Sequence, residues 1–449
     1  MSILNSEGQA TKALVEKWSP VIDHDAFGSV IDQTKRRHLA IVLENQERAA
    51  MESGSMLMEA GPGNQTGGPL SGNTGAGIAK YDPVLISLVR RTMPKLIAYD
   101  ICGVQPLTQP TGLVFAMRTR YDTQSGAEAF YNEADSGKSG TGTQAGQVTD
   151  QASIGGAGTA FTNGTGIDTA SGEALGDVAG GAAAFAKMGF TIEKVVCTAK
   201  TRAMAADYST ELAQDLKALH GLDAEAELSN ILATEILAEQ NREILRAMYV
   251  TAKPGCVSGS TVTAGVFDLD TDSNGRWSQE RFLGLGFQIN REANVIAQQT
   301  RRGKGNFMIV SADVASALAM SGKLQYAPVN STEKIGTVDE GAGATYVGTF
   351  DGMKVYIDPY VGNANASSQF VLIGYKGANV YDAGLYFSPY VPLQMVKTID
   401  PNTFQPKFAF KTRYALTANP FAEGTTQGQG ALTANANVYF RKFSVRNLV

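Results

Sequence analysis

The chain has 449 residues, of which 43% are hydrophobic and 18% charged, and a formal net charge of −5. This length suggests about three domains with enough chain to bury a large core. The acidic balance argues against a reader of nucleic-acid sequence, which would carry a basic patch, although a protein that encloses DNA is compatible with it.

Cysteine usage and hydropathy exclude two further classes. Cys102, Cys197 and Cys256 are odd in number and far apart, which disfavours a disulfide framework or a zinc knuckle. There is no apolar run of 18 residues and no secretory signal pattern. We therefore expect a soluble protein that is intracellular at synthesis.

The N-terminal 59 residues are highly charged, and most of the chain's 49 glycines cluster further along the chain. Leu39, Val42, Leu43 and Met51 recur at roughly helical spacing, which predicts an amphipathic helix over 30–52. Such a helix either packs on a neighbouring domain or binds a partner and is later removed.

The next segment has little to bury. Residues 60–80 are mostly Gly, Asn, Thr and Ser, which predicts an extended or mobile arm. Asp82 and Pro83 are typical of a helix start, and Pro94 ends this short helix.

Two strands are predicted on either side of a low-complexity region. Residues 112–121 alternate, with Leu113, Phe115, Met117 and Tyr121 on one face, and residues 191–202 form a second candidate strand. The region between them, 122–189, is rich in Gly, Ala, Ser and Thr. This combination predicts an extended two-stranded arm with an elaborated tip.

A long helical signal follows. Ser209 is a good N-cap for a first helix, and Asp223 restarts the pattern to about Tyr249, a span of roughly 40 Å. We call this second helix the spine helix. Its charges predict two i,i+3 pairs on the solvent side, Glu239–Arg242 and Glu243–Arg246.

From about residue 256 the pattern is mixed α/β. A helix over 279–300, a buried strand over 307–310 and a hairpin turning at Asp351–Gly352 are predicted. A strand over 370–377 and two late strands complete the pattern, and we expect the late strands to return to the spine helix.

The sequence contains only partial matches to known catalytic and ligand-binding motifs. Asp270, Asp272 and Asn274 begin like a calcium loop, but Arg281 stands at its twelfth position. Gly137-Lys138-Ser139 resembles the end of a phosphate loop without its first glycine, and His220 lies at a helix end. We predict no catalytic, cofactor-binding or metal-binding residues, and no enzyme activity.

Several longer runs resemble a known family. The chain is similar throughout to the major capsid proteins of T-even-type tailed bacteriophages, in the runs ALVEKW (13–18), VLENQE (42–47), LIAYDICGVQPLTQPTG (96–112), ELAQDLKALHGLDAEAELSNILATEI (211–236), RGKGNF (302–307), VYIDPY (355–360), GYKG (374–377) and FKTRY (410–414). The resemblance implies an α+β HK97-like capsid fold.

The parts of that fold can be placed on this chain. The resemblance implies a propeptide (1–59), an N-terminal arm and helix (60–111), an extended loop (112–205) with a reduced Gly-rich insertion (122–189), a peripheral-domain spine (206–254), an axial domain (255–390) and C-terminal strands returning to the peripheral domain (391–449). T-even relatives carry a sizeable folded insertion where this chain is shorter and richer in Gly and Ala, so we expect a reduced or partly disordered module.

The resemblance also implies a function. Family members form hexameric capsomers that build the icosahedral head shell around the phage genome. The implied partners are other copies of the chain, the vertex protein, the scaffold core, the prohead protease, decoration proteins, the portal and packaged double-stranded DNA held without sequence-specific binding. The implied locations are the virion and, during assembly, the host cytoplasm.

Family propeptides are cut after a glutamate in a Leu/Ile-x-Glu context. Leu57-Met58-Glu59 matches this pattern, and so do Leu14-Val15-Glu16 and Leu237-Ala238-Glu239. Because Glu239 lies in the spine helix and Glu59 borders the Gly-rich arm, the expected cut is between Glu59 and Ala60, with Leu57 as the recognition residue.

Three alternatives remain. A pentamer-forming vertex protein shares the fold and would occupy a different position in the shell. A cellular encapsulating compartment would lack the propeptide, and an enzyme with a Gly-rich surface module would be a soluble monomer.

Overall fold

The computed structural model describes most of the chain. The described residues are 12–20, 22, 33–58, 96–130, 133–144, 162–176, 184–220, 223–257, 263–273, 275, 277–326, 345–361, 368–379, 381–423 and 430–448. The chain divides into two compact units, one of residues 114–195 and one of the residues on either side. The predicted arm over 60–80 and helix over 83–93 lie outside the described residues.

Helices and strands alternate along the chain, as an α+β fold requires. The helices are α2 (Gln33–Met58), α4 (Ala98–Ile101), α6 (Thr169–Glu173), α7 (Thr210–His220), α8 (Ala224–Thr251), α9 (Ser278–Thr300) and α10 (Ala312–Met320). The strands are β1 (Gly103–Val104), β2 (Thr111–Tyr121), β3 (Met188–Thr198), β4 (Lys200–Asp207), β5 (Ala252–Pro254), β6 (Val266–Asp268), β7 (Phe307–Val310), β8 (Leu324–Tyr326), β9 (Thr345–Phe350), β10 (Met353–Ile357), β11 (Ser368–Gly374), β12 (Leu385–Ile399), β13 (Pro406–Ala418) and β14 (Asn437–Arg446).

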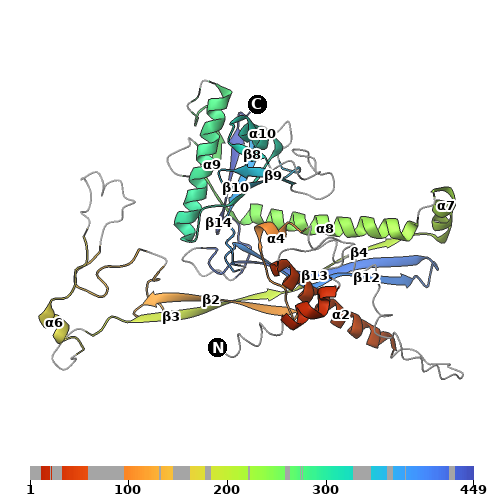
Figure 1. Ribbon diagram of the computed structural model, residues 1–449, viewed down its shortest axis with the longest axis horizontal. Coiled ribbons are helices and arrows are strands. Elements are labelled where there is room, and N and C mark those ends of the chain that lie inside the picture. Colours follow the sequence, from red (N-terminus) through yellow and green to blue (C-terminus); the bar gives the residue numbers. More distant parts are fainter. Residues whose placement is uncertain are drawn as a thin grey trace. The chain divides into compact units, whose positions relative to one another are not determined.

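These strands build three sheets. A mixed sheet has the order β5-β14-β11-β7-β10-β9-β8, with β6 also paired to β14, and a second sheet has the order β1-β12-β13-β4. The third sheet is the two-stranded β2–β3 hairpin. Figure 1 shows α9 running beside β14 of the first sheet. The side chains between α9, α10 and this sheet form one of the buried cores.

The predicted hairpin turn in this block is confirmed. Asp351 (φ 47°) and Gly352 (φ 79°) both have positive φ between β9 and β10. Two consecutive positive φ values identify the type I′ turn, whose twist matches that of the strands it joins. The Asp-Gly pair thus sets the register of Phe350 opposite Met353.

The predicted spine helix is also confirmed. Ser209 Oγ accepts a hydrogen bond from Leu212 N, and the Asp223 carboxylate accepts one from Glu225 N at the start of α8. These caps satisfy amide groups that have no partner within the helix. The helix buries one face, including Ile236, Ile244 and Met248.

The charge pairs predicted along the spine helix are wrong. Arg242 pairs with Asp358 from the segment after β10, and Glu239 and Glu243 both pair with Arg202 on β4. Partly buried partners on other elements are less screened by water than neighbours on an exposed helix face. The helix therefore uses these charges to bind other parts of the fold.

One strand prediction needs correction, and the late strands belong to two different sheets. The predicted strand over 191–202 is interrupted after Thr198, so that β3 belongs to the hairpin and β4 to the sheet of β12 and β13. Both late strands contact the spine helix, as predicted, but they do so in different sheets. β13 pairs with β4, whereas β14 pairs with β11 along seven residue pairs. Both differences depend on pairing with distant strands.

The predicted N-terminal helix is longer than expected. It begins at Gln33 and continues to Met58, and residues 12–20 form a further helical segment. Leu39, Val42 and Leu43 are buried, as their spacing predicted. This helix packs against β12 within the larger unit.

Candidate assembly surfaces

The β2–β3 hairpin exposes its apolar side chains. Phe115, Met117, Phe190 and Ile192 are between 57% and 66% exposed. We call these four residues the apolar hairpin face. A two-stranded ribbon has no second layer of its own to cover such a face. The hairpin therefore presents an apolar row to whatever packs on it.

The opposite face of the hairpin holds a buried charge cluster. The Arg118 side chain is fully buried, and its guanidinium lies 3.1 Å from Glu193 Oε1 and 3.3 Å from Glu128 Oε2. Burial raises the pKa of Glu128, against the opposing effect of Arg118. The ion cluster joins both strands to the loop that follows β2. The hairpin thus buries charged side chains and exposes apolar ones, which is the reverse of the usual distribution.

Sequence periodicity predicted these strands without saying which face is covered. The alternation of Phe115 and Met117 with Ala116 and Arg118 would normally place the larger apolar side chains inside. One sequence signal could have indicated the buried face: the opposite charges Arg118 and Glu193 stand at positions that alternate with the apolar side chains.

Two polar clusters anchor the spine helix. Asp358 is 1% exposed and accepts hydrogen bonds from Arg242 Nη1 at 2.6 Å and from Tyr249 Oη at 2.5 Å. Burial raises the pKa of Tyr249, with a further contribution from Asp358, so the phenol remains a donor. Arg202, Glu243 and Tyr414 form the second cluster. These contacts join the spine helix to β4, to β13 and to the segment after β10.

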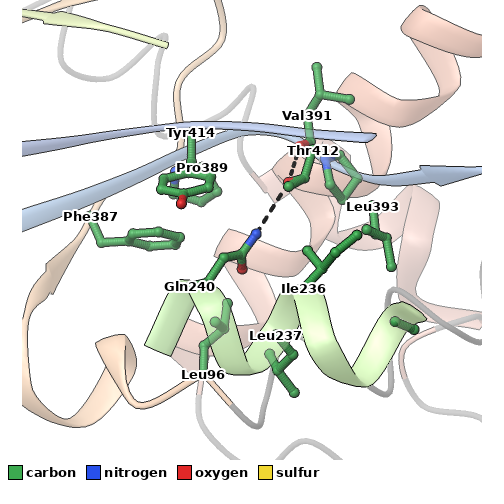
Figure 2. Close-up of a pocket in the computed structure, with 12 residues that line it drawn as sticks. Leu96, Ile236, Leu237, Gln240, Phe387, Pro389, Val391, Leu393, Thr412 and Tyr414 are labelled. Carbon is green, nitrogen blue, oxygen red and sulfur yellow. Dashed lines mark hydrogen bonds between the residues drawn. The ribbon is translucent and has the colours of Figure 1, made fainter. Parts of the chain in front are cut away.

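The cavity beside the spine helix is too small for a metabolite. It measures about 30 Å³ and lies between α8 and strands β12 and β13. Figure 2 shows Gln240 directed toward Thr412, whose hydroxyl donates to the Val391 carbonyl at 3.2 Å. Since a water needs about 10–15 Å³ by this measure, the space has room for about two or three waters.

A larger cleft of about 1100 Å³ lies beside α9, β5 and β14. Its charged lining comprises Lys253, Arg291, Lys304 and Arg441 with a single carboxylate, Glu292. Burial lowers the pKa of Lys253, and the nearby Arg441 lowers it further. A concave, cationic surface of this kind is complementary to an acidic segment of another molecule.

The predicted cleavage site lies where the described range 33–58 ends. Leu57 belongs to the last turn of α2, while Glu59 and Ala60 lie outside the described residues. Of the competing glutamates, Glu16 lies in the helical residues 12–20, and Glu239 lies within α8.

Residues of the calcium-loop-like and phosphate-loop-like motifs form local ion pairs where the structure describes them. Asp270 forms an ion pair with Arg281, and Lys138 forms one with Asp122. Asn274 and the His220 side chain are outside the described residues. Over the part of the chain that the structure describes, no three His, Cys, Asp or Glu side chains form a metal cluster, and no helix could cross a membrane.

The three cysteines have no exposed thiol. Cys102, Cys197 and Cys256 are all buried, and none of the three forms a disulfide. Burial raises the pKa of each thiol, to about 12 for Cys102 and for Cys256. Nucleophilic catalysis needs a thiolate, so these residues act as small core side chains.

The described surfaces thus include an exposed apolar hairpin face and a cationic cleft. The Gp23 major capsid protein family matches residues 78–445, and the chain belongs to this family. It is 43% identical to the major capsid protein of Salmonella phage ViI over 396 residues, covering 84% of this chain and 87% of that protein. It is 36% identical to the major capsid protein of Enterobacteria phage T4, covering 98% of this chain and 99% of that protein.

Two further comparisons concern the vertex protein and solved structures. The capsid vertex protein of Enterobacteria phage T4 is 29% identical over 52% of this chain and 53% of its own length. A solved capsid of Myoviridae phage XM1 is 10% identical, covering 78% of this chain and 92% of that chain, with a TM-score of 0.37. The α+β architecture and the capsid-protein family predicted from the sequence are confirmed.

Proposed function

We propose that the chain is the major shell-forming subunit of a T4-like phage head and that it assembles first into hexameric capsomers. Membership of the Gp23 family supports the shell role. The observation that carries the proposal is the apolar hairpin face, which no described residue of the hairpin covers. In a head-to-tail ring each subunit can cover the face of its neighbour.

The energy available from this face is sufficient to matter. Full burial of one large apolar side chain stabilises by about 1.5–3 kcal/mol, and these four side chains are already partly covered. Covering what remains exposed contributes on the order of 5 kcal/mol per hairpin, before the costs of association. A ring repeats this contact at every subunit, so a weak pairwise contact becomes a stable assembly.

Assembly of single-residue variants tests the proposal. Phe115→Asp should leave thermal unfolding of the unassembled subunit nearly unchanged, because the side chain is exposed there, yet abolish rings and shells in electron micrographs. Lys194→Asp is the matched control, since Lys194 is an exposed polar residue on the same face of β3. Shells of Phe115→Asp at normal yield would refute the role of this face.

Proteolytic maturation is the second part of the proposal. We infer a cut between Glu59 and Ala60, with Leu57 recognised, that removes residues 1–59. Its support is positional: the helix preceding it ends at Met58, whereas Glu239 lies inside α8 and is paired with Arg202. Fraying of the last turn of α2 would give the protease access. Intact mass of virion protein tests this, and any N-terminus other than Ala60 would contradict it.

The proposed partners follow from this role. They are other copies of the chain, the capsid vertex protein, the scaffold core, the prohead protease, decoration proteins, the portal and packaged DNA. Proposed locations are the virion and, during assembly, the host cytoplasm. The implied domain boundaries, with the propeptide ending at residue 59 and the axial domain over 255–390, belong to the same proposal.

The reduced insertion at 122–189 also remains a proposal. An alignment of 526 positions with the T4 protein is longer than this chain of 449 residues, so that relative contains segments this chain lacks. Strong amide protection across 140–180 in assembled shells would contradict a partly disordered module.

The vertex protein is the second candidate function. It forms pentamers in the implied architecture, and its similarity covers only half of the chain. Location of the subunit in a particle reconstruction separates the two: occupancy of hexamers supports the major shell role, and occupancy of five-fold vertices alone would replace it.

A further inference from the structure

The N-terminal helices are packed into the main core of the protein. Trp18, Ile22, Leu39, Val42 and Leu43 are each at most 7% exposed. They belong to one buried cluster with side chains of the body, which include Leu96, Ile101, Val104, Phe387 and Tyr414. We call the described residues between 12 and 58 the N-terminal cap.

A pair of hydrogen bonds fixes the position of this cap. Asn45 is 6% exposed, and its Nδ2 donates to the carbonyls of Leu107 at 2.8 Å and of Tyr390 at 2.9 Å. The two amide protons thus reach two chain segments that lie far apart in the sequence. A buried amide with both donors satisfied specifies one register of the helix, because a shift would leave them without acceptors.

The two helical parts of the cap are also joined to each other. Lys17 Nζ lies 2.8 Å from Glu44 and is also bonded to Glu47, and Trp18 Nε1 donates to Glu44 at 3.1 Å. Hydrogen bonds to Glu44 and Glu47 raise the pKa of Lys17. The cap therefore has internal contacts in addition to its contacts with the body.

In the sequence, the cap is linked to the body through residues 59–95, which include the proposed cut. Cleavage at Glu59 would break this link but none of the contacts just described. We propose that the cap remains bound to the body after the chain is cut, so that its release is a separate step in maturation. The body thus has a binding surface, formed around residues 96–107 and β12, for an amphipathic helix that carries a buried asparagine. This inference rests on the proposed cut.

The test places the cut under experimental control. Residues 57–60 are replaced by the recognition sequence of a site-specific protease, and the purified full-length chain is cut to completion. We expect the N-terminal fragment to co-elute with the body in equimolar amount on size exclusion at micromolar concentration, as measured by mass spectrometry. Separation of the two fragments at that concentration would overturn the proposal.

Two variants show whether the described contacts hold the fragment. In the cut chain, Leu43→Ala should speed dissociation roughly 30-fold or more, because truncation of a buried leucine removes apolar contact and leaves a cavity. Arg37→Ala is the control, since Arg37 is exposed on the same helix. Equal dissociation rates of the two variants would also overturn the proposal.

A third variant tests the two hydrogen bonds of Asn45. Asn45→Leu removes both hydrogen bonds and should also speed dissociation relative to Arg37→Ala, while an unchanged rate would contradict the role of Leu107 and Tyr390. A virion protein that begins at a residue other than Ala60 would refute the natural cut, yet it would leave the co-elution result intact. The two proposals can therefore fail separately.

Discussion

Removal of the buried cation in the hairpin should open it at neutral pH. Arg118→Met keeps much of the side-chain volume but leaves Glu193, 5% exposed, and Glu128, 11% exposed, without their shared counterion. Breaking a buried ion pair by removing one partner costs about 3–5 kcal/mol. The hairpin can limit this cost only by letting a carboxylate bind a proton or by opening to water.

The size of the effect depends on pH. Protonating a carboxyl of ordinary pKa, about 4.3, at pH 7 costs roughly 3.7 kcal/mol, at 1.36 kcal/mol per pH unit. This cost falls as pH decreases and vanishes near pH 4, because the carboxyl then binds a proton in the opened state as well. The variant should therefore lose about 100-fold or more of its hairpin amide protection at pH 7 and regain much of it near pH 4.

Hydrogen exchange of the unassembled chain measures this effect. Protection of residues 114–121 and 188–195 is compared with the native chain at each pH, after correction for intrinsic exchange rates. Lys194→Met, which changes an exposed cation on β3, should have no comparable effect. Combining Arg118→Met with Glu193→Met should restore part of the protection. Unchanged protection in Arg118→Met at pH 7 would refute the argument that the cluster closes the hairpin.

Three further predictions concern the larger unit. Asp358→Asn should lower the unfolding free energy by about 1–3 kcal/mol in urea titration, because it weakens a buried, charge-assisted hydrogen bond from Arg242, and an unchanged midpoint would contradict this. Gly352→Ala should cost about 1 kcal/mol in the same assay, since φ there is 79°, and a stabilised variant would show that the turn tolerates a side chain. At pH 8, alkylation of Cys102 and Cys256 should be about 1,000-fold slower in the folded than in the unfolded chain, and comparable rates would show that these thiols are accessible.

The parts of the fold that depend on local pattern could be predicted from the sequence. The spine helix has its start encoded by Asp223 and its buried face by apolar spacing, and the β9–β10 turn is encoded by Asp351 and Gly352. Caps and turns satisfy their own hydrogen bonds within a few residues, so their signals do not depend on the rest of the chain. The long shared runs likewise predicted the family, which the comparisons confirmed.

Partners distant in the sequence were decided only by the tertiary structure. Arg242 was expected to pair along its own helix, yet it binds Asp358, which lies 116 residues away. The last strand, β14, lies against the spine helix as expected, but its pairing with β11 was not predicted. A charged side chain or a strand edge can be satisfied by many partners, and local periodicity does not choose among them.

The association surfaces show the same division between local and tertiary information. Alternation determined that residues 112–121 form a strand, whereas only the three-dimensional arrangement showed that Arg118 is buried and Phe115 exposed. Spacing likewise determined an amphipathic N-terminal helix and left open whether its apolar stripe contacts this chain or a partner. The structure places that stripe in the core and Asn45 on two distant carbonyls, because which surface covers an apolar face depends on long-range packing.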